Sequence, residues 1–207
     1  MSKEILCIGS LSLDVFLPYN ELEIRDTPED TLSKQKILFE AGAKYRAKDR
    51  YDAPGGCATN VSQGLARLGC KASLVAGVGA DNLGESLVRE VQSEGVNTEY
   101  VFRHEGSKTD LGVIVVDKRT GERTIFYNRD TNETFVFREE MFVEPDGVFV
   151  SGLYGNWREN IRTVTQYARD NHCELYYNPS HSNVSEDPHV VWETCMESAG
   201  VFLNKDE

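Results

Sequence analysis

The sequence predicts an α/β fold with a mainly parallel central sheet. Short apolar segments alternate with amphipathic helical patterns along most of the 207 residues, and this alternation is typical of strands joined by helical crossovers. Two β-rich segments between residues 111 and 128, with a turn between them, predict a hairpin in addition. We therefore expect one α/β domain over residues 1–207 that carries a small additional β element.

The first half of the chain gives a strand, a helix, a strand and a helix in that order. Residues 4–8 and 71–79 are apolar segments of the kind that buried strands need. Residues 57–69 and 81–95 place apolar or small side chains at helical spacing, and each segment closes with a glycine. Residues 17–51 are polar and irregular, so we expect an excursion from the core with one short strand.

The second half of the chain resumes the alternation after the hairpin at 111–128. A strand is expected at 146–152, a helix at 156–171 and a strand at 173–179. A last strand at 199–204 is followed by only a few residues. Because a helix normally follows and covers each strand of an α/β sheet, we expect this domain to be incomplete at its C-terminal end.

Composition and charge exclude several classes of protein. No segment approaches the roughly 20 apolar residues of a membrane span, and the N-terminus has no export-signal pattern. The formal charge of −12 at pH 7 would repel a polyanion. We interpret the basic stretch at 43–51 as solvated surface. We therefore expect neither a nucleic-acid partner nor a membrane partner.

The cysteines indicate a reduced protein of the cytoplasm. They are odd in number and widely spaced, and no C-x-x-C pair occurs among them. No His or Asn pattern accompanies Cys57, so we do not expect this thiol to act as a nucleophile. The five cysteines are Cys7, Cys57, Cys70, Cys173 and Cys195.

A glycine pair immediately precedes the helix expected at 57–69. Gly55 and Gly56 lack a Cβ, so the backbone there can contact a ligand. The first turn of the helix offers unpaired N–H groups that suit an anion or a ring of hydroxyls. Asn60 supplies a donor and an acceptor near that end, as recognition of a polyol requires. Alternatively, the glycines form a plain turn and Asn60 is a surface residue of the helix.

Asp14 is expected just beyond the C-terminal end of the first strand, at the edge where open α/β sheets bind ligands. Its carboxylate can accept two hydroxyl hydrogen bonds, or it can instead cap a turn or a helix. A different class, the NAD-linked oxidoreductases, is disfavoured. Gly77, Gly79 and Gly84 miss the G-x-G-x-x-G spacing, and no acidic partner for a ribose follows them.

Several segments together resemble the ribokinase family, the phosphofructokinase-B type carbohydrate and nucleoside kinases. Residues 55–69 and 75–96 resemble its N-terminal signature, and residues 9–14 resemble its opening strand, whose aspartate holds the sugar. Residues 204–207 resemble its Asn-x-x-Glu motif. The resemblance implies a three-layer α/β sandwich with a small β lid, built here by residues 15–51 and 111–128.

The resemblance also implies an activity and a set of roles. The family transfers the γ-phosphoryl group of ATP to a sugar hydroxyl, with Mg²⁺ as the metal. Asp14 and Asn60 would bind substrate hydroxyls, and the glycine pair at 55–56 would let the backbone close on the sugar. Asn204 and Glu207 would organise the magnesium and phosphate environment through water.

The sequence departs from the family in its second signature. The Gly-Ala-Gly-Asp loop is absent from the 207 residues, so no catalytic base can be named, and about the last third of a family member is missing. The chain is then a fragment of a longer kinase, expected to be inactive alone, or a truncated, non-catalytic sugar-binding protein.

The choice of substrate is left open by the sequence. Residues 148–153 lack the glutamate of ribose-using relatives, which disfavours ribose. Arg129 resembles the arginine that some relatives direct at an acidic sugar, or it is an exposed loop residue. A nucleoside kinase is the nearest alternative, because Phe126 and Tyr127 could stack on a base. The excursion at 17–51 could also form a homodimer contact through the lid.

Overall fold

The structure of the chain is a computed structural model, and it describes residues 3–20, 22–30, 34–138 and 145–204. The chain divides into two compact units. The first unit comprises Met1–Leu13, Pro54–Asp110 and Arg129–Glu207, and the second comprises Asp14–Ala53 and Leu111–Asn128. Both segments that the sequence assigns to a β lid belong to the second unit, whose action as a lid stays a prediction.

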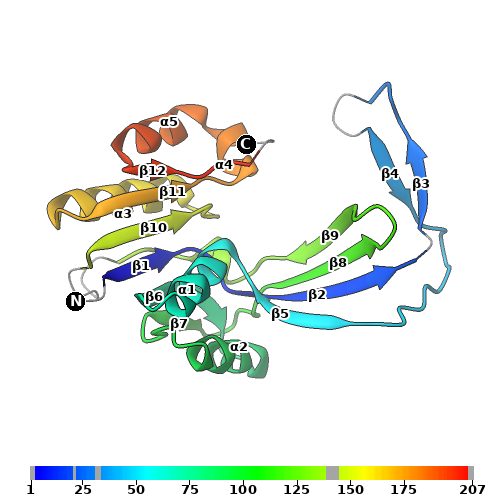
Figure 1. Ribbon diagram of the computed structural model, residues 1–207, viewed down its shortest axis with the longest axis horizontal. Helices are drawn as coiled ribbons and strands as arrows, with labels where there is room; N and C mark the ends of the chain where they lie inside the picture. Colours follow the sequence, from blue (N-terminus) through cyan, green and yellow to red (C-terminus); the bar gives the residue numbers. More distant parts are fainter. Residues whose placement is uncertain (1–2, 21, 31–33, 139–144, 205–207) are drawn as a thin grey trace. The chain divides into compact units, whose positions relative to one another are not determined.

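A parallel sheet forms the centre of the first unit (Figure 1). Its strands lie in the order β12-β11-β10-β1-β6-β7, and every neighbouring pair is parallel. The mainly parallel sheet predicted from the sequence is thereby confirmed. The strands are β1 (Glu4–Ile8), β6 (Lys71–Gly79), β7 (Val101–His104), β10 (Gly147–Ser151), β11 (Glu174–Asn178) and β12 (Gly200–Val201).

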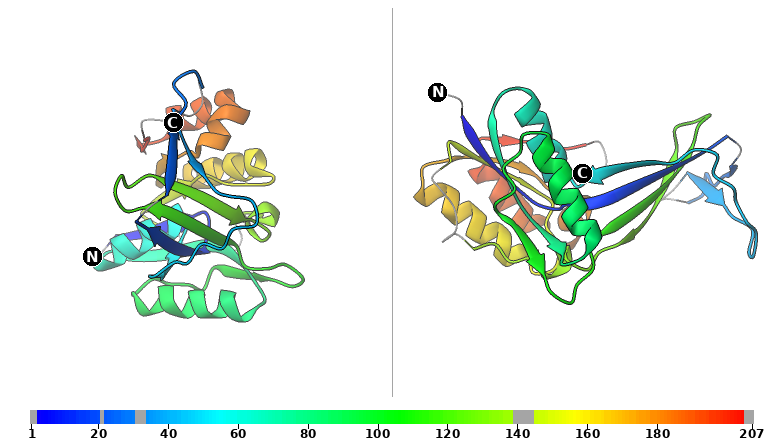
Figure 2. Two further views of the ribbon diagram at one scale, coloured as in Figure 1. Left: turned by 90° about the vertical axis from the view of Figure 1, so that its right-hand side faces the viewer. Right: turned by 90° about the horizontal axis from the view of Figure 1, so that it is seen from below.

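Helices cover both faces of this sheet, which gives the three layers expected (Figure 1, Figure 2). On one face α1 (Cys57–Arg67) and α2 (Asn82–Ser93) enclose a core cluster that includes Cys7 of β1. On the other face α3 (Trp157–Asp170) and α5 (Pro188–Glu197) enclose a cluster that includes Leu6 and Ile8 of the same strand. Successive side chains of β1 thus enter opposite cores, as a strand buried on both faces requires.

The second unit consists of β-sheet. A four-stranded sheet has the order β5-β2-β8-β9, and a separate two-stranded sheet pairs β3 with β4. The predicted hairpin is present, because β8 and β9 are antiparallel with Ile114 opposite Ile125. The strands are β2 (Ser12–Tyr19), β3 (Glu23–Asp26), β4 (Gln35–Leu38), β5 (Tyr51–Gly55), β8 (Leu111–Asp117) and β9 (Arg123–Asn128).

A buried carboxylate fixes the turn between β8 and β9. Asp117 is fully buried and accepts hydrogen bonds from the guanidinium of Arg119 at 2.7 and 3.2 Å. Backbone N–H groups of Leu22, Arg119 and Thr120 donate to the same carboxylate. The pKa of Asp117 is lowered, mainly by the hydrogen bond from the Arg119 side chain and further by the backbone N–H groups. These contacts outweigh the burial of the carboxylate, which alone would raise the pKa. The turn is therefore tied to the chain at Leu22, which lies just before β3.

Two segments differ from the sequence-based expectation. Residues 17–51 were expected to hold one short strand, but the last three residues of β2 and all of β3 and β4 lie in that range. The sequence predicted no element between the strands expected at 173–179 and 199–204, but this stretch contains α4 (His181–Glu186) and α5. None of the helices in the described ranges has the length and hydropathy of a membrane span.

The start of α2 depends on one aspartate. Asp81 accepts from the Gly84 N–H at 2.8 Å, as an N-cap does. It also accepts from the N–H and the hydroxyl of Thr109, at 2.9 and 2.7 Å. Burial opposes ionisation of Asp81, but these hydrogen bonds outweigh burial and lower its pKa.

Replacing Asp81 with Ala should lower the free energy of unfolding at neutral pH by about 1–2 kcal/mol, because the helix loses its cap. Since the folded-state pKa is lowered, the contribution of the carboxylate exists above its unfolded pKa of about 3.9 and is lost as pH falls through the folded value. Urea denaturation at about pH 7 and about pH 3 measures both effects.

The control for this prediction is Glu85→Gln. Glu85 also lies in the first turn of α2, but it is exposed and its ion pair with Arg89 is 3.6 Å long. We expect a change below about 0.5 kcal/mol for this variant. An equal loss for Asp81→Ala at both pH values would contradict the role given to the charge.

Candidate functional site

The first unit contains a topological switch point beside β1. From β1 the sheet grows through β6 and β7 on one side, and through β10, β11 and β12 on the other. Open α/β sheets bind ligands outside the carboxyl ends of the strands where this reversal occurs. The carboxyl ends of β1 and β10 are followed by Gly9–Ser10 and by Gly152. These ends are therefore the place to look for a site.

The N-terminus of α1 is held against the carboxyl end of β1. Thr59 donates its hydroxyl to the Ser10 carbonyl oxygen at 2.8 Å. A Cβ on Gly56 would lie 2.1 Å from that same oxygen, and the φ of Gly56 is +102°. A Cβ on Gly9 would lie 2.1 Å from Ser151 Oγ. Glycine is required here because two chain segments pack in contact, which explains Gly56 independently of any ligand.

Asn60 lies at the exposed side of the same helix end. Its N–H donates to the Gly56 carbonyl oxygen at 2.9 Å, which closes the first turn of α1. Gly56 provides no side-chain cap, and the first turn holds no acidic residue. Gly55 is buried as the last residue of β5. Of the predicted residues, the structure thus groups Gly55, Gly56 and Asn60 at one helix N-terminus.

Asp14 occupies a different place from the one expected. It is the third residue of β2 and the first residue of the second unit, rather than a residue of the turn that follows β1. Its side chain is half-buried. The preceding residue, Leu13, donates its N–H to the Asp110 carbonyl oxygen at 3.0 Å. The first unit thus fixes the chain one residue before Asp14.

Arg129 stacks on an aromatic ring in the first unit. Its guanidinium carbon lies 3.7 Å from the centroid of the Tyr154 ring, three residues beyond β10. The loop that carries Tyr154 is tightly placed, because a Cβ on Gly155 would lie 1.9 Å from the Glu133 carbonyl oxygen. A cation–π contact of this kind fixes a guanidinium while its edge keeps hydrogen-bond donors.

Asp110 organises the chain around Arg129, and sequence reasoning missed it. Asp110 is 2% exposed and accepts from the N–H groups of Asp130 and Thr131 at 2.8 and 2.9 Å. The Asn132 side-chain amide donates to the other carboxylate oxygen at 2.6 Å. The donors lie about twenty residues away, so no local pattern could reveal the contact. An aspartate directly before a strand was the only available signal.

The predicted phosphate and metal residues lie at the end of the described chain. Asn204 is exposed and follows β12, where the Asn178 side-chain amide donates to the Phe202 carbonyl oxygen at 2.7 Å. Glu207 lies outside the described residues. Within the described ranges, no group of three or more His, Cys, Asp or Glu side chains could hold a metal ion.

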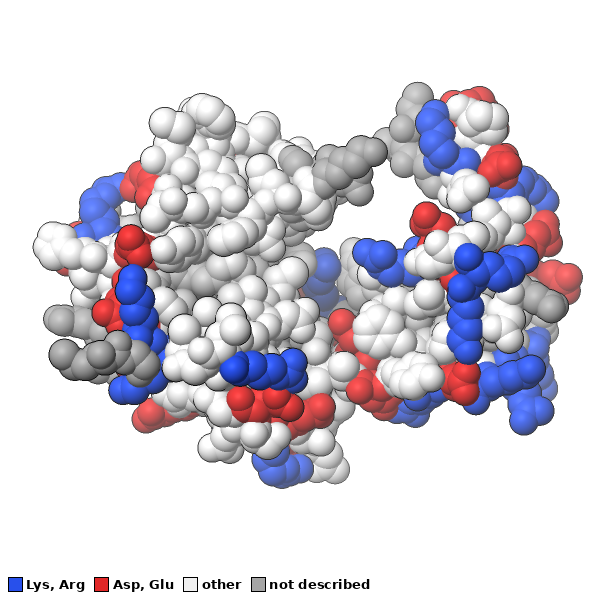
Figure 3. Space-filling model, viewed as in Figure 1, with Lys and Arg blue, Asp and Glu red and all other residues white. Residues whose placement is uncertain are grey.

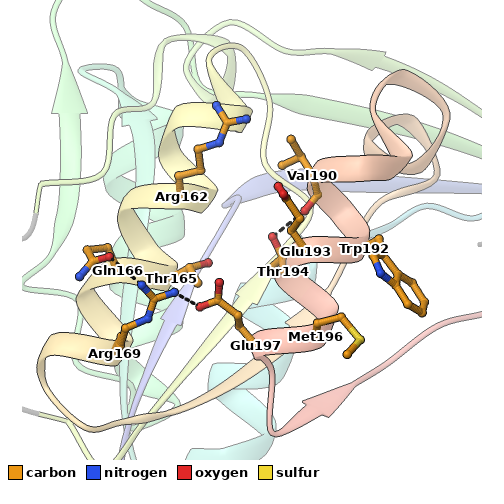
Figure 4. A pocket seen from close by; sticks show the side chains of 10 residues that line it. All are labelled: Arg162, Thr165, Gln166, Arg169, Val190, Trp192, Glu193, Thr194, Met196 and Glu197. Carbon is orange, nitrogen blue, oxygen red and sulfur yellow. Dashed lines mark hydrogen bonds and ion pairs between the residues drawn. The ribbon is translucent and has the colours of Figure 1, made fainter.

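A groove of about 470 Å³ lies elsewhere in the first unit, between α3 and α5 (Figure 4). Arg169 of α3 and Glu197 of α5 form an ion pair there. The groove also presents Arg162 and Glu193, so each helix contributes charges of one sign. None of the predicted site residues lines it. We therefore treat the groove as separate from the switch-point site.

Comparisons with known proteins give a consistent result. A profile described as pfkB family carbohydrate kinase matches residues 3–207. The chain is 25% identical to the Arabidopsis thaliana protein named Probable fructokinase-6, chloroplastic. The alignment covers 100% of this chain and 54% of that protein. It is 26% identical to 5-dehydro-2-deoxygluconokinase of Geobacillus kaustophilus, over 99% of this chain and 58% of that protein. The chain thus spans little more than half the length of these curated relatives.

Solved structures share the fold. One is a nucleoside kinase of Methanocaldococcus jannaschii, described as an archaeal member of the ribokinase family. It aligns with a TM-score of 0.75 at 17% identity, and the alignment covers 98% of this chain and 61% of that one. A nucleoside kinase of Burkholderia thailandensis in complex with inosine aligns with a TM-score of 0.73 at 14% identity, over 97% and 59% of the two chains. The three-layer fold is therefore the fold of these proteins.

Replacing Gly56 with Ala should lower the free energy of unfolding by about 2–4 kcal/mol, because the Cβ meets a backbone oxygen and the positive φ disfavours a side chain. Gly64→Ala is the matched control in the same helix, since no atom lies within 4 Å of its added Cβ. That control should gain about 0.5–1 kcal/mol. Thermal and urea unfolding measure both, and a neutral Gly56→Ala would contradict the packing argument.

Proposed function

Because this chain belongs to the pfkB family of carbohydrate kinases, we propose that it forms the substrate-binding part of an ATP-dependent kinase that phosphorylates a hydroxyl group of a sugar or sugar-like molecule. One observation carries the proposal. The N-terminus of α1, without a side-chain cap, lies after Gly55–Gly56 and is held at the carboxyl end of β1 by Thr59 and Ser10.

The chemistry of this helix end suits a polyhydroxylated ligand. The N–H groups of the first turn are donors, and the exposed Asn60 side chain adds a donor and an acceptor. Asp14 supplies a carboxylate, which accepts charge-assisted hydrogen bonds from hydroxyls. We propose that Asn60 and Asp14 orient the substrate and that the second unit, acting as a lid, excludes water from it.

ATP and Mg²⁺ are the cosubstrate and metal that this proposal requires. When bound, the ion would neutralise charge on the phosphates of ATP. We propose that Asn204 and Glu207 help to organise the magnesium and phosphate environment through water, because Mg²⁺ in kinase sites keeps several of its water ligands. We assign no residue of this chain as the catalytic base, and phosphoryl transfer by the 207 residues alone is expected to be weak or absent.

Two narrower substrate classes each have one supporting observation. An acidic sugar is supported by Arg129, whose guanidinium is fixed over Tyr154. A nucleoside is supported by Phe126 and Tyr127, which are 55% and 62% exposed on β9 and could stack on a base. The same exposed strand supports a homodimer through the second unit, which an oligomeric-state measurement would reveal.

A panel of neutral sugars, sugar acids and nucleosides should identify a ligand that raises the melting temperature of the chain without ATP. At a ligand concentration of about one hundred times Kd, the gain is about 2.7 kcal/mol. Asn60→Ala and Asp14→Asn should abolish the shift. The control is Asn82→Ala, an exposed asparagine in the first turn of α2.

Either of two outcomes would contradict this proposal. The first is a panel with no stabilising sugar, sugar acid or nucleoside. The second is a ligand whose shift survives Asn60→Ala and Asp14→Asn unchanged, because the binding site would then lie elsewhere. A third outcome is stabilisation by a ligand without ATP turnover, even after the C-terminal region of a relative is added as a separate chain. That outcome would favour the non-catalytic sugar-binding protein.

Arg129→Lys should distinguish the acidic-sugar class from the neutral sugars. A lysine keeps the charge but loses the planar fork, so affinity for a 2-keto-3-deoxy acid should fall by about tenfold or more while neutral sugars are unaffected. Calorimetric titration of both ligand types measures this. An equal effect on both types would assign Arg129 a structural role in the loop.

A further inference from the structure

A second candidate site lies in the second unit, and none of the residues assigned to the substrate lines it. A pocket of about 250 Å³ lies where β2 ends and the turn after β8 begins. Half of its lining residues carry a positive charge. The lining residues are Pro18, Tyr19, Asn20, Arg46, Lys48 and Lys118.

The charges of the pocket are only partly neutralised. Lys118 Nζ lies 2.9 Å from Asp49, and Arg50 Nε lies 2.7 Å from Asp52. These two aspartates are the only acidic residues between positions 41 and 53, and each is engaged by one of those two cations. The ion pairs found among the described residues of this segment are Lys118–Asp49 and Arg50–Asp52, and neither includes Arg46 or Lys48. The pocket therefore presents two cations beyond the charge that Asp49 balances.

The charge of the whole chain is divided unequally between the units. The second unit holds 10 of the 22 Lys and Arg residues in 58 of the 207 residues, with 11 acidic residues. Its formal charge is −1, so the first unit carries −11 of the total −12. Figure 3 shows several Lys and Arg side chains on the surface of the second unit, with Asp and Glu side chains between them. An anion that the chain as a whole repels is thus least opposed there.

The basic segment is anchored rather than free to turn away. The Lys118 N–H donates to the Tyr19 carbonyl oxygen at 2.8 Å, which joins two walls of the pocket. The Tyr19 hydroxyl reaches the Tyr45 carbonyl oxygen at 3.4 Å, and the two rings meet edge to face at 6.4 Å. The Tyr45 hydroxyl accepts from the Glu40 N–H at 2.9 Å. Tyr45 thus holds Arg46 beside the end of β2.

We propose that this pocket binds the phosphate group of a small molecule. Arg46 supplies a planar set of donors that matches phosphate oxygens, and Lys48 and Lys118 supply point charges for a dianion. The volume of the pocket is about 250 Å³. It lies below the roughly 300–1,000 Å³ of a pocket for a whole drug-sized ligand. The phosphate enters the pocket, and the rest of the ligand stays outside.

Residues 43–51 then have a role beyond the solvated surface expected from the sequence. The sequence showed a basic stretch interrupted by Asp49. In the structure Asp49 pairs with Lys118, which lies in the turn between β8 and β9. Arg46 and Lys48 line the same pocket as Lys118. The site is independent of the proposed kinase activity, because it uses none of the residues assigned to the sugar.

The experiment titrates the 207-residue chain with inorganic phosphate, a hexose phosphate and ADP at constant ionic strength, by calorimetry and by amide NMR shifts. We expect saturable binding, with shifts at Asn20, Lys48 and Lys118. Arg46→Gln with Lys48→Gln should raise Kd about tenfold or more, equivalent to about 1.4 kcal/mol. Lys44→Gln with Arg25→Gln removes the same charge outside the pocket and should change Kd by less than about twofold.

The three phosphate sources separate the possible ligands. Tighter binding of the hexose phosphate than of free phosphate assigns a sugar phosphate to the site, and tighter binding of ADP assigns a nucleotide. Three results would overturn the proposal: no saturable binding, equal weakening by both double variants, or shifts confined to residues 55–60. Preferential binding of a single-stranded oligonucleotide would overturn it as well, because the ligand would then be a polymer.

Discussion

Hydrogen bonds to the carboxylate and the carbonyl group of Asp110 join three of the four places where the chain passes from one unit to the other. These are the places after Leu13, after Asp110 itself and after Asn128. The chain crosses after Leu13, Ala53, Asp110 and Asn128. The Asp110 carbonyl oxygen accepts from Leu13, while its carboxylate accepts from Asp130 and Thr131 and from the side chain of Asn132. A buried carboxylate is tolerated only when donors surround it in this way. The start of β2 and both ends of the hairpin therefore share one anchor within the first unit.

This anchor matters for the residues assigned to the substrate. Asp14 directly follows Leu13, and Arg129 directly precedes Asp130. Each assigned residue is thus one peptide unit away from a group that Asp110 binds, and Arg129 is additionally fixed over Tyr154. The glycine pair and Asn60 are held separately, by the contact of α1 with Ser10. Two independent devices of the first unit, one electrostatic and one steric, hold the segments that carry the proposed chemistry.

Much of the first unit was predictable, because its signals are local. The strands at 71–79 and 146–152 and the helix at 156–171 follow from apolar periodicity, which a short window of sequence contains. The second unit was harder, because every residue of β2 is only half-buried and its strand partners are distant in the chain. The start of α5 was missed although Asp187 and Pro188 are a typical helix start. For the candidate site, the structure places both glycines at the N-terminus of α1 and explains Gly56 by its contact with Ser10. Their role in binding a substrate stays a prediction.

The contact between Gly56 and Ser10 also limits how the gene can change. Any nucleotide substitution in a glycine codon that alters the residue adds at least a Cβ atom or a stop codon. At Gly56 that atom would lie 2.1 Å from the main-chain oxygen of Ser10. Because every residue at position 10 has this oxygen, no substitution there removes the clash. A Cβ on Gly9 would instead meet two side-chain atoms, Ser151 Oγ at 2.1 Å and Ala58 Cβ at 2.8 Å. The two glycines therefore have different mutational freedom. The clashes at position 9 involve side chains, which changes at codons 58 and 151 together could remove, whereas the nearest clash at position 56 is with the main chain.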